Sequence, residues 1–510
     1  MPKNTAMKKL MPYIPKVVSY FFILLFCYAA ISKALDFENF QVQIGQSPLL
    51  SAYAGFVSFA VIALEVIIVL LLIFPRSNLL GLYTSTALMS AFTIYIFLIL
   101  NYSEFVPCSC GGILEKMGWT EHLVFNIFCV LFGCVSVWIL GEETNHSKRK
   151  TSFLLIISNF TACLSILFLF FQSEHIIKKE NNFTRRFLIH PVIEKQNIIL
   201  DNDTYYFAGQ ECSTLYFGNR KYPLSVTEMD TTLLKSETRY VEPDQKKLNF
   251  KNISLSVKDL NYYIYDGTVP IIFKGQLGND TAKTISFQDA YFNSLIIQDS
   301  STYAIRTQSA ATKNFTLATL HLNSLSKLKM HDSILEKQAD GVFDLDGILL
   351  RDKAENELIY IYAYRNQFIV MNDEMGIKHR LNTIDTVKNA QIKSVQLSDG
   401  SHKMNQPPLK VNSHSFAYRG LLFNHSALMG KNESKSAWKK ADIIDVYRTD
   451  EQVYIGSFYI YRKMGRKLSD LYVVDNSLYV LQDNLLTKYN ISKQITKYFR
   501  KGEAEKPYQE

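Results

Sequence analysis

The first third of the chain alternates long apolar runs with short polar connections. Five runs reach the ~20 residues with which an α-helix crosses a bilayer: residues 17–35, 52–74, 79–100, 122–140 and 152–172. The second run carries a single charge, Glu65, and the first ends beside Lys33, whose long side chain can reach the membrane interface. The pattern predicts an all-α transmembrane bundle of four spans plus a fifth.

After residue 173 the pattern changes to short β-rich runs that are bounded by Asn, Asp and Gly. Six examples are residues 204–207, 261–265, 291–297, 358–362, 415–418 and 471–474. Their first residues are 57, 30, 67, 57 and 56 positions apart, and 30 plus 67 is close to two repeats of ~50 residues. Repeats of ~40–50 residues with four strands each are typical of propeller blades. We therefore expect a C-terminal all-β domain, a six-bladed propeller.

Composition divides the chain in the same way. The first 175 residues hold 10 Lys/Arg and 9 Asp/Glu, against 45 and 38 in the remaining 335. We expect a four-span bundle over residues 1–145, a fifth helix and linker over 146–184, and an external domain over 185–510. The net charge of +8 is spread along the chain and forms no basic stripe, so no nucleic-acid partner is expected.

Loop charges predict the orientation of the bundle. The N-terminal lead, the turn with Arg76 and the loop with residues 148–150 are basic, whereas the loops 36–51 and 101–121 are acidic or balanced. Positive loops stay cytoplasmic, so the N-terminus is expected in the cytoplasm and the C-terminal domain on the external face, the periplasm of a bacterial inner membrane. The first run could instead be a cleaved signal peptide, since it follows four lysines.

Cys108 and Cys110 are the strongest candidates for chemistry. They lie in Pro107-Cys-Ser-Cys-Gly-Gly112, in a predicted external loop before the fourth span, for which Thr120 is the expected N-cap. A disulfide between cysteines one residue apart needs a tight, strained turn, and strained exposed disulfides are the labile ones. Two alternatives remain: the cysteines could form a stable disulfide that only fixes the loop, or they could supply two of the ligands of a metal site. The cysteines at 27, 129, 134 and 163 lie in apolar spans, and Cys212 stands alone in the external domain.

Glu65 is the second candidate, because a carboxyl group inside a span is costly and should face the bundle interior with a partner. It could relay protons or bind a quinone, or it could only bond a buried Ser, Thr or Tyr. Lys33 and Asp36 flank the end of the first span, and they could simply pair with each other. His122, beside Trp119 at the start of the fourth span, could move protons for the thiols or serve as a polar cap.

These residues together resemble a known family. The run Tyr28–Phe40, Glu65, and Pro107–Gly112 followed by Trp119–Asn126 are similar to the MauE branch of the DoxX-like membrane proteins over about residues 10–145. The resemblance implies a role in maturing methylamine dehydrogenase, whose small subunit is rich in disulfides, or in quinone-linked sulfur oxidation. Lys33, Asp36, Glu65, Cys108 and Cys110 match the family pattern, whereas the fifth span and the large external domain are additions.

The sequence thus favours a membrane thiol-redox accessory protein, a thiol–disulfide oxidoreductase or its accessory subunit. Cys108 and Cys110 would exchange electrons with an envelope client protein, supported by Glu65, Lys33, Asp36 and His122. The expected partners are that client and the lipid bilayer, no metal is expected, and quinone is the one candidate cofactor. Two rivals remain open: a non-enzymatic, membrane-anchored propeller that acts as a binding scaffold, and a subunit of a quinone-linked sulfur oxidoreductase.

Overall fold

A computed structural model describes residues 11, 13–46, 54–102, 118–144, 147–177, 183–398, 402–431 and 433–500. These residues divide into two compact units, each of which is described by itself. The first unit covers Met1–Lys179 together with Ile392–Pro408, and the second covers Glu180–Gln391 and Leu409–Glu510. Residues 392–408 therefore group with the membrane helices, although the chain on both sides of them belongs to the β-rich unit.

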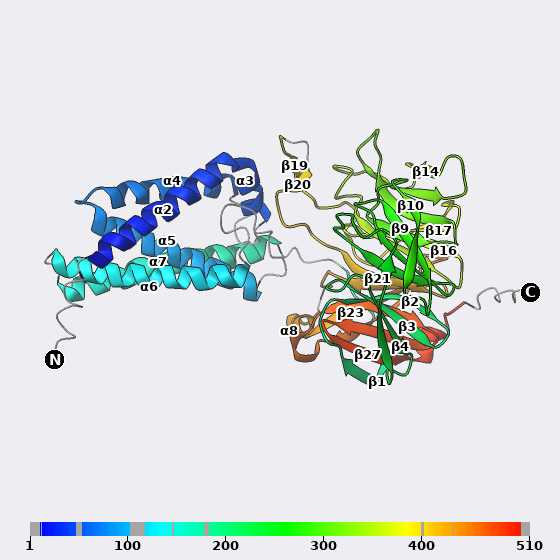
Figure 1. The fold of residues 1–510 in the computed structure, drawn as a ribbon. Coiled ribbons are helices and arrows are strands. Elements are labelled where there is room, and N and C mark those ends of the chain that lie inside the picture. The colour runs from blue at the N-terminus through cyan, green and yellow to red at the C-terminus, as the bar shows by residue number, and fades with distance from the viewer. Residues whose placement is uncertain are drawn as a thin grey trace, which may run out of the picture. The chain divides into compact units, whose positions relative to one another are not determined.

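The first unit is a bundle of long apolar helices (Figure 1). Its helices are α2 (Tyr13–Leu35), α3 (Phe37–Gln46), α4 (Ala54–Ile73), α5 (Asn78–Tyr102), α6 (Trp119–Glu143) and α7 (Lys148–Ile177). All except α3 are long and apolar enough to cross a membrane, which confirms the five predicted spans. The interior is an apolar cluster around Phe22, Phe26, Leu72 and Val137, while many large apolar side chains on the outside of the bundle are exposed, as a lipid-facing surface requires.

Successive spanning helices lie side by side and run in opposite directions (Figure 1). The end of α2, all of α3, the start of α4, the end of α5, the start of α6 and the end of α7 consequently lie at one end of the bundle. Lys33 and His122 belong to this end, which we call the α3 end.

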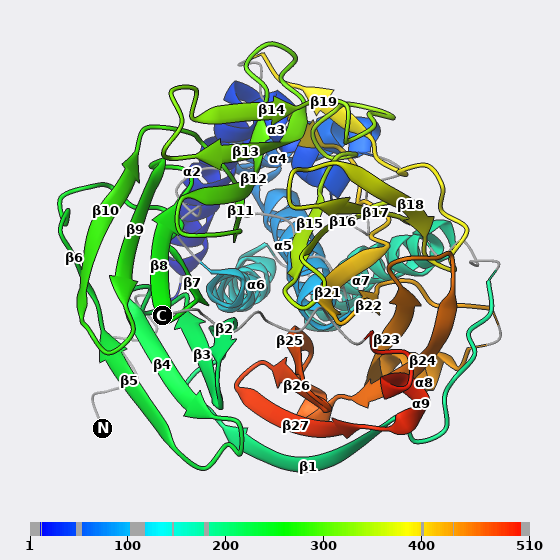
Figure 2. The ribbon, with the colours of Figure 1, turned by 90° about the vertical axis from the view of Figure 1, so that its right-hand side faces the viewer.

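The second unit is a ring of sheets, and Figure 2 shows them arranged radially about a central axis. Six sheets of four or five strands, together with a separate two-stranded hairpin, make up the described β-structure. This confirms the predicted six-bladed propeller. The six expected runs do not occupy equivalent strands of their blades. The runs that begin at 261 and 358 lie in the second strand from the central axis, and the others lie in or beside the innermost strand, which explains their irregular spacing.

The blades are numbered I to VI in chain order from β2. Blade I contains β2 (Tyr205–Glu211), β3 (Thr214–Asn219), β4 (Ser225–Asp230) and β5 (Ser236–Tyr240), and blade II contains β6 (Glu242–Pro243), β7 (Ser254–Lys258), β8 (Asn261–Asp266), β9 (Ile271–Gln276) and β10 (Thr281–Phe287). Blade III contains β11 (Ser294–Ile297), β12 (Thr302–Gln308), β13 (Phe315–His321) and β14 (Leu328–His331), and blade IV contains β15 (Gly347–Asp352), β16 (Glu357–Tyr362), β17 (Gln367–Asn372) and β18 (Ile377–Asn382).

Blade V contains β21 (Asn412–Tyr418), β22 (Leu421–Ser426), β23 (Ala441–Arg448) and β24 (Tyr454–Tyr461), with the short helix α8 (Lys435–Lys440) before β23. Blade VI contains β25 (Leu468–Val474), β26 (Ser477–Gln482), β27 (Leu485–Ile491) and, as its outer strand, β1 (Val192–Ile199). The 3₁₀-helix η3 (Lys463–Gly465) and the helix α9 (Lys493–Thr496) flank this blade. The hairpin of β19 (Ser394–Gln396) and β20 (His402–Met404) stands outside the blades.

The propeller is closed by strands from both ends of its sequence. Strand β1 pairs antiparallel with β27, so that Val192 faces Ile491 and Ile199 faces Leu485. An apolar cluster then fills the space between each pair of neighbouring blades, as Leu215 and Leu481 do between blades I and VI. Pairing the first strand with the last removes a free sheet edge and ties the ring into one cooperative unit.

Candidate functional site

Lys33 and Glu65 form an ion pair inside the bundle. The ammonium nitrogen of Lys33, on α2, lies 2.5 Å from Oε1 of Glu65, on α4. The Glu65 side chain is fully buried, whereas about a quarter of the Lys33 side chain is exposed. Two of the alternatives from sequence were therefore wrong: Lys33 pairs with Glu65 and not with Asp36, and the partner of Glu65 is an ammonium and not a hydroxyl group.

The second carboxylate oxygen of Glu65, Oε2, is buried and has no hydrogen-bond partner among the described residues. A buried polar atom without a partner costs roughly 1–3 kcal/mol, and more when the group is charged. The bundle thus keeps an acceptor, or a protonation position, that its own described side chains do not use.

One aromatic side chain of α3 lies over Lys33, and another packs on α4. The ring centroid of Phe40, on α3, lies 5.6 Å from the Lys33 ammonium, and the ring of Phe37 packs on Phe59 of α4 with centroids 4.6 Å apart. A cation over an aromatic face is attracted by the ring quadrupole. Sequence analysis treated residues 36–51 as a loop and missed α3. Apolar residues at 37, 40 and 44, with Glu38 and Gln41 between them, are the helical signal in that segment.

His122 lies in the first turn of α6, and its ring is 6.3 Å from that of Trp119. The expected cap, Thr120, was wrong, because α6 begins at Trp119 after Gly118 as N-cap. Gly118 donates its N–H to Oε2 of Glu121 at 2.9 Å, so a carboxylate of the first turn caps the start of the helix.

Asp36 lies between α2 and α3, where its carbonyl accepts the N–H of Phe40.

Cys108 and Cys110 lie outside the described residues. Within the described part of the chain, Cys27, Cys129, Cys134, Cys163 and Cys212 are free thiols. No group of three or more His, Cys, Asp or Glu side chains with metal-binding geometry occurs among the described residues.

The propeller contains a buried charge of a different kind. Arg185 is fully buried, and its guanidinium donates to Asp445 at 2.8 Å, to Glu433 at 2.6 Å and to Ser426 at 2.7 Å. These three partners belong to blade V or to the connection between its strands, so the segment that follows the last membrane helix is locked into this blade. Two carboxylates that share one buried guanidinium raise its pKa.

Asp352, at the end of β15, has a raised pKa. Burial raises the pKa of this fully buried carboxyl group to about 6. It accepts the backbone N–H groups of Arg419 at 3.1 Å and Gly420 at 2.7 Å, both in the left-handed turn between β21 and β22. The carboxyl group thus ties blade IV to blade V, and we assign it a structural role.

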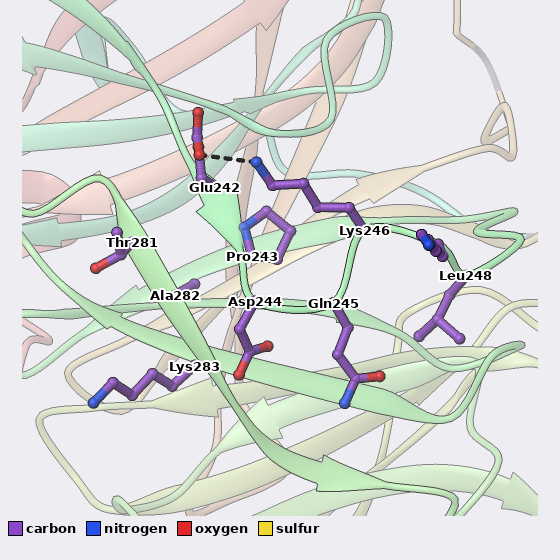
Figure 3. Close-up of a pocket in the computed structure, with 10 residues that line it drawn as sticks. Glu242, Pro243, Asp244, Gln245, Lys246, Leu248, Thr281, Ala282 and Lys283 are labelled. Atoms are coloured by element: carbon purple, nitrogen blue, oxygen red, sulfur yellow. Dashed lines mark hydrogen bonds and ion pairs between the residues drawn. The ribbon is translucent and has the colours of Figure 1, made fainter.

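One surface hollow lies at the outer edge of blade II, with a volume of about 810 Å³ (Figure 3). It is lined by residues 242–248 and 281–283. Its ion pair, Glu242 with Lys246 at 2.8 Å, has both side chains more than 60% exposed. Exposed pairs of this kind are screened by water and salt, so nothing in this hollow favours binding chemistry over ordinary surface solvation.

The chain has similarity to known proteins in both units. Residues 11–139 match the family model described as Methylamine utilisation protein MauE. No curated protein sequence matches the chain.

Three solved structures have low similarity to this chain, at TM-scores of 0.33 to 0.38. A duf4221 family member from Bacteroides vulgatus is 13% identical, at a TM-score of 0.38, over 62% of this chain and 99% of its own. BamB from Moraxella catarrhalis is 10% identical, at 0.33, over 59% and 98%. Virginiamycin B lyase from Staphylococcus aureus is 9% identical, at 0.35, over 58% and 99%.

The strand order, and not these distant neighbours, carries the propeller assignment. The match over residues 11–139 covers α2 to most of α6 and includes Lys33, Asp36, Glu65, Cys108, Cys110 and His122. The resemblance inferred from those residues is confirmed. This chain is a multi-pass membrane protein that joins a helical membrane domain, similar to the MauE family over residues 11–139, to a six-bladed β-propeller.

Proposed function

We propose that this chain is a membrane-bound thiol-redox accessory protein, in which Cys108 and Cys110 exchange electrons with a client protein of the cell envelope. The observation that carries the proposal is the Lys33–Glu65 pair with its unpartnered Oε2, which belongs to a MauE-type bundle. Both cysteines lie in the sequence between the end of α5 and the start of α6. The cysteine pair would supply the disulfide for the exchange, and the buried carboxyl group would bind a proton that accompanies the electrons.

The exchange balances as follows. A thiolate of the client attacks one sulfur of the Cys108–Cys110 disulfide, and a second client thiolate resolves the mixed disulfide, leaving the client oxidised. The cysteine pair gains two electrons and two protons. A membrane quinone accepts the same two electrons and two protons and so regenerates the disulfide. Glu65 takes up a proton on its free oxygen during the exchange and then releases it, Lys33 holds the other oxygen in place, and Asp36 and His122 carry protons at the bundle end.

The sidedness of the molecule supports an envelope client. The basic connections of the bundle favour a cytoplasmic N-terminus, which places the cysteine loop and the propeller in an oxidising external compartment. There the propeller would hold the client near the cysteine pair. The family description points to methylamine utilisation, and a disulfide-rich enzyme of the methylamine dehydrogenase type is the model client.

The deciding experiment replaces the two cysteines singly in cells that also express a disulfide-rich envelope client. Cys108→Ser and Cys110→Ser should each leave the client reduced, as measured by the mobility shift of thiols trapped with a maleimide-linked polymer. Cys163→Ser is the matched control, because this thiol lies in α7 near the Ser90 carbonyl and takes no part in the exchange. Unchanged client oxidation in both loop variants would refute the proposal.

A second measurement tests the compartment and the rivals. After mild reduction of intact cells, an impermeant maleimide should label Cys108 and Cys110 from outside, and labelling only after lysis would contradict the proposal. A pure scaffold predicts that the pair stays oxidised under that reductant and that residues 185–510 retain all client binding. A sulfur oxidoreductase subunit predicts co-purified quinone that is lost on Glu65→Ala, with no change in client thiols.

A further inference from the structure

Residues 392–408 interrupt the propeller between blades IV and V. Strand β18 of blade IV ends at Asn382 and β21 of blade V begins at Asn412, and the hairpin of β19 and β20 lies in this connection. Ser394 faces Met404 and Gln396 faces His402 in the hairpin. Although both flanks belong to the propeller unit, these residues group with the membrane unit. We call residues 392–408 the strap.

The strap is held on α3 by directed contacts. The Glu38 carboxylate, in the first turn of α3, accepts both the backbone N–H of Ser398 at 3.2 Å and its hydroxyl at 3.1 Å. Further along the helix, Gly45 meets the backbone of Asn405 so closely that a Cβ at Gly45 would lie 2.1 Å from the Asn405 carbonyl oxygen. Only glycine allows this approach, so the sequence of α3 is fitted to a backbone that crosses it.

The helix α3 uses two different faces for its two neighbours. Positions 38, 41 and 45 share one side of a helix, because residues three and four apart lie above one another. Glu38 and Gln41, together with the start of α4 and the strap, line a polar pocket of about 430 Å³. Positions 37, 40 and 44 share the other side: Phe37 packs on Phe59, Phe40 covers the Lys33 ammonium, and Ile44 joins the apolar cluster around Leu98 and Ile99.

The residues on both sides of the strap pack in one apolar cluster of the propeller unit. Val387, before the strap, and Leu409 and Val411, after it, pack with Leu428 and with Phe183. Phe183 is the first described residue after the connection that leaves α7. Residues beside all three points where the chain passes from one unit to the other, namely before the strap, after it and after α7, therefore belong to a single cluster.

We propose that the strap is a coupling device, which seats α3 over Lys33 and Glu65 and so passes client binding at the propeller to the buried ion pair. Two states suffice for this coupling. With the strap seated, Glu38 and Gly45 are engaged, and Phe40 shields the pair. With the strap released, α3 keeps only its bundle face, Phe40 withdraws, and the Lys33 ammonium turns toward water. Coupling exists because the strap contacts α3 in one state only.

Gly45→Leu in the full-length protein tests the proposal, because it blocks the strap and leaves Lys33, Glu65 and every cysteine intact. The probe is dicyclohexylcarbodiimide, which modifies protonated carboxyl groups in apolar surroundings, and the readout is the labelling rate of Glu65 by peptide mass spectrometry in native membranes. Glu65 without its ammonium partner takes up a proton, so we expect labelling to be about fivefold faster or more. Glu142→Gln, at the opposite end of the bundle, is the control and should leave the rate unchanged.

A second set of variants keeps the test decisive if Gly45→Leu folds poorly. Glu38→Ala, Ser398→Ala and the double variant should accelerate labelling to the same extent, since either single change already removes the contact. Seating itself is measured by a short bismaleimide bridging Gln41→Cys to Gln406→Cys, two positions that line the same pocket and leave the Glu38–Ser398 contact intact, with Glu142→Cys and Gln406→Cys as the control pair. Failure of that bridge would overturn the strap, and a bridge with labelling rates unchanged in the other variants would overturn the coupling. No readout involves thiol exchange, so these outcomes are independent of the proposed function.

Discussion

Arg185 in the propeller and Glu65 in the bundle are buried charges with different bonding. In the propeller, all three guanidinium nitrogens of Arg185 donate hydrogen bonds, to Asp445, Glu433, Ser426 and the Leu428 carbonyl. In the bundle, Glu65 has Lys33 on one oxygen and no described partner on the other. A buried charge with all its bonds made is an anchor that gains nothing from titrating. A buried charge with one position free is the kind that chemistry uses, because protein interiors rarely leave such atoms without a reason.

Removal of the anchor should have the largest effect. Arg185→Met would leave Asp445 and Glu433 buried without a counter-ion, which typically costs about 3–5 kcal/mol. We expect that loss in the free energy of unfolding of the full chain, measured in detergent by urea titration and near-ultraviolet circular dichroism.

Arg239→Met is the matched control, since Arg239 pairs with Glu237 at the surface and such pairs contribute less than about 1 kcal/mol. A loss of similar size in the two variants would remove the distinction between anchoring and ordinary ion pairs.

The second effect concerns pH. The pKa of Asp352 is raised to about 6 by burial, above the ordinary value of the unfolded chain, so the folded state binds the extra proton. Its stabilising contribution is complete at low pH and is lost as pH rises through that pKa, by roughly 3 kcal/mol at neutral pH. Asp352→Asn should therefore lack this loss.

The check is urea unfolding of both proteins in detergent at pH 4.5 and pH 7.5. The variant should be the less stable one at pH 4.5, where it lacks one hydrogen bond to Arg419 or Gly420, and should recover relative to the native chain at pH 7.5. A difference that is constant across pH would mean that Asp352 does not titrate in this range.

Sequence predicted the scaffold better than the partners of the candidate residues. Five spans follow from uninterrupted apolar length, and blades follow from short runs between turns, so both are local signals. The Lys33–Glu65 pair joins helices whose residues are 32 positions apart, and no local pattern distinguishes it from Lys33–Asp36. The strap contact joins Glu38 to Ser398 across 360 positions. Its only trace in the sequence is a longer interval between inner strands β15 and β21 than between their neighbours.

The third effect sharpens the contrast with Arg185. Glu65→Gln should cost only about 1 kcal/mol of stability, because interhelical polar contacts in membranes are weak and the partly exposed Lys33 can reach the interface. Under the proposed function the same change should slow client oxidation by about tenfold or more, since the amide cannot take up a proton.

Thermal unfolding in detergent and the rate of client thiol loss measure the two quantities. Glu142→Gln, which breaks the exposed pair with Lys148, should change neither. A large loss of stability with unchanged oxidation would make Glu65 an anchor like Arg185, and the comparison between the units would disappear.

The smallest effect lies at the entrance to α6, next to the cysteine loop. Glu121→Ala removes the acceptor for the Gly118 N–H, and a lost cap costs about 0.5–1 kcal/mol. We expect faster hydrogen exchange at the first amides of α6, including that of His122, with global stability almost unchanged. Thr120→Ala removes the cap that sequence alone predicted, on an exposed side chain, and should not alter exchange. If Thr120→Ala frays the helix more than Glu121→Ala, the helix starts where the sequence suggested, and His122 presents a different face to the cysteine loop.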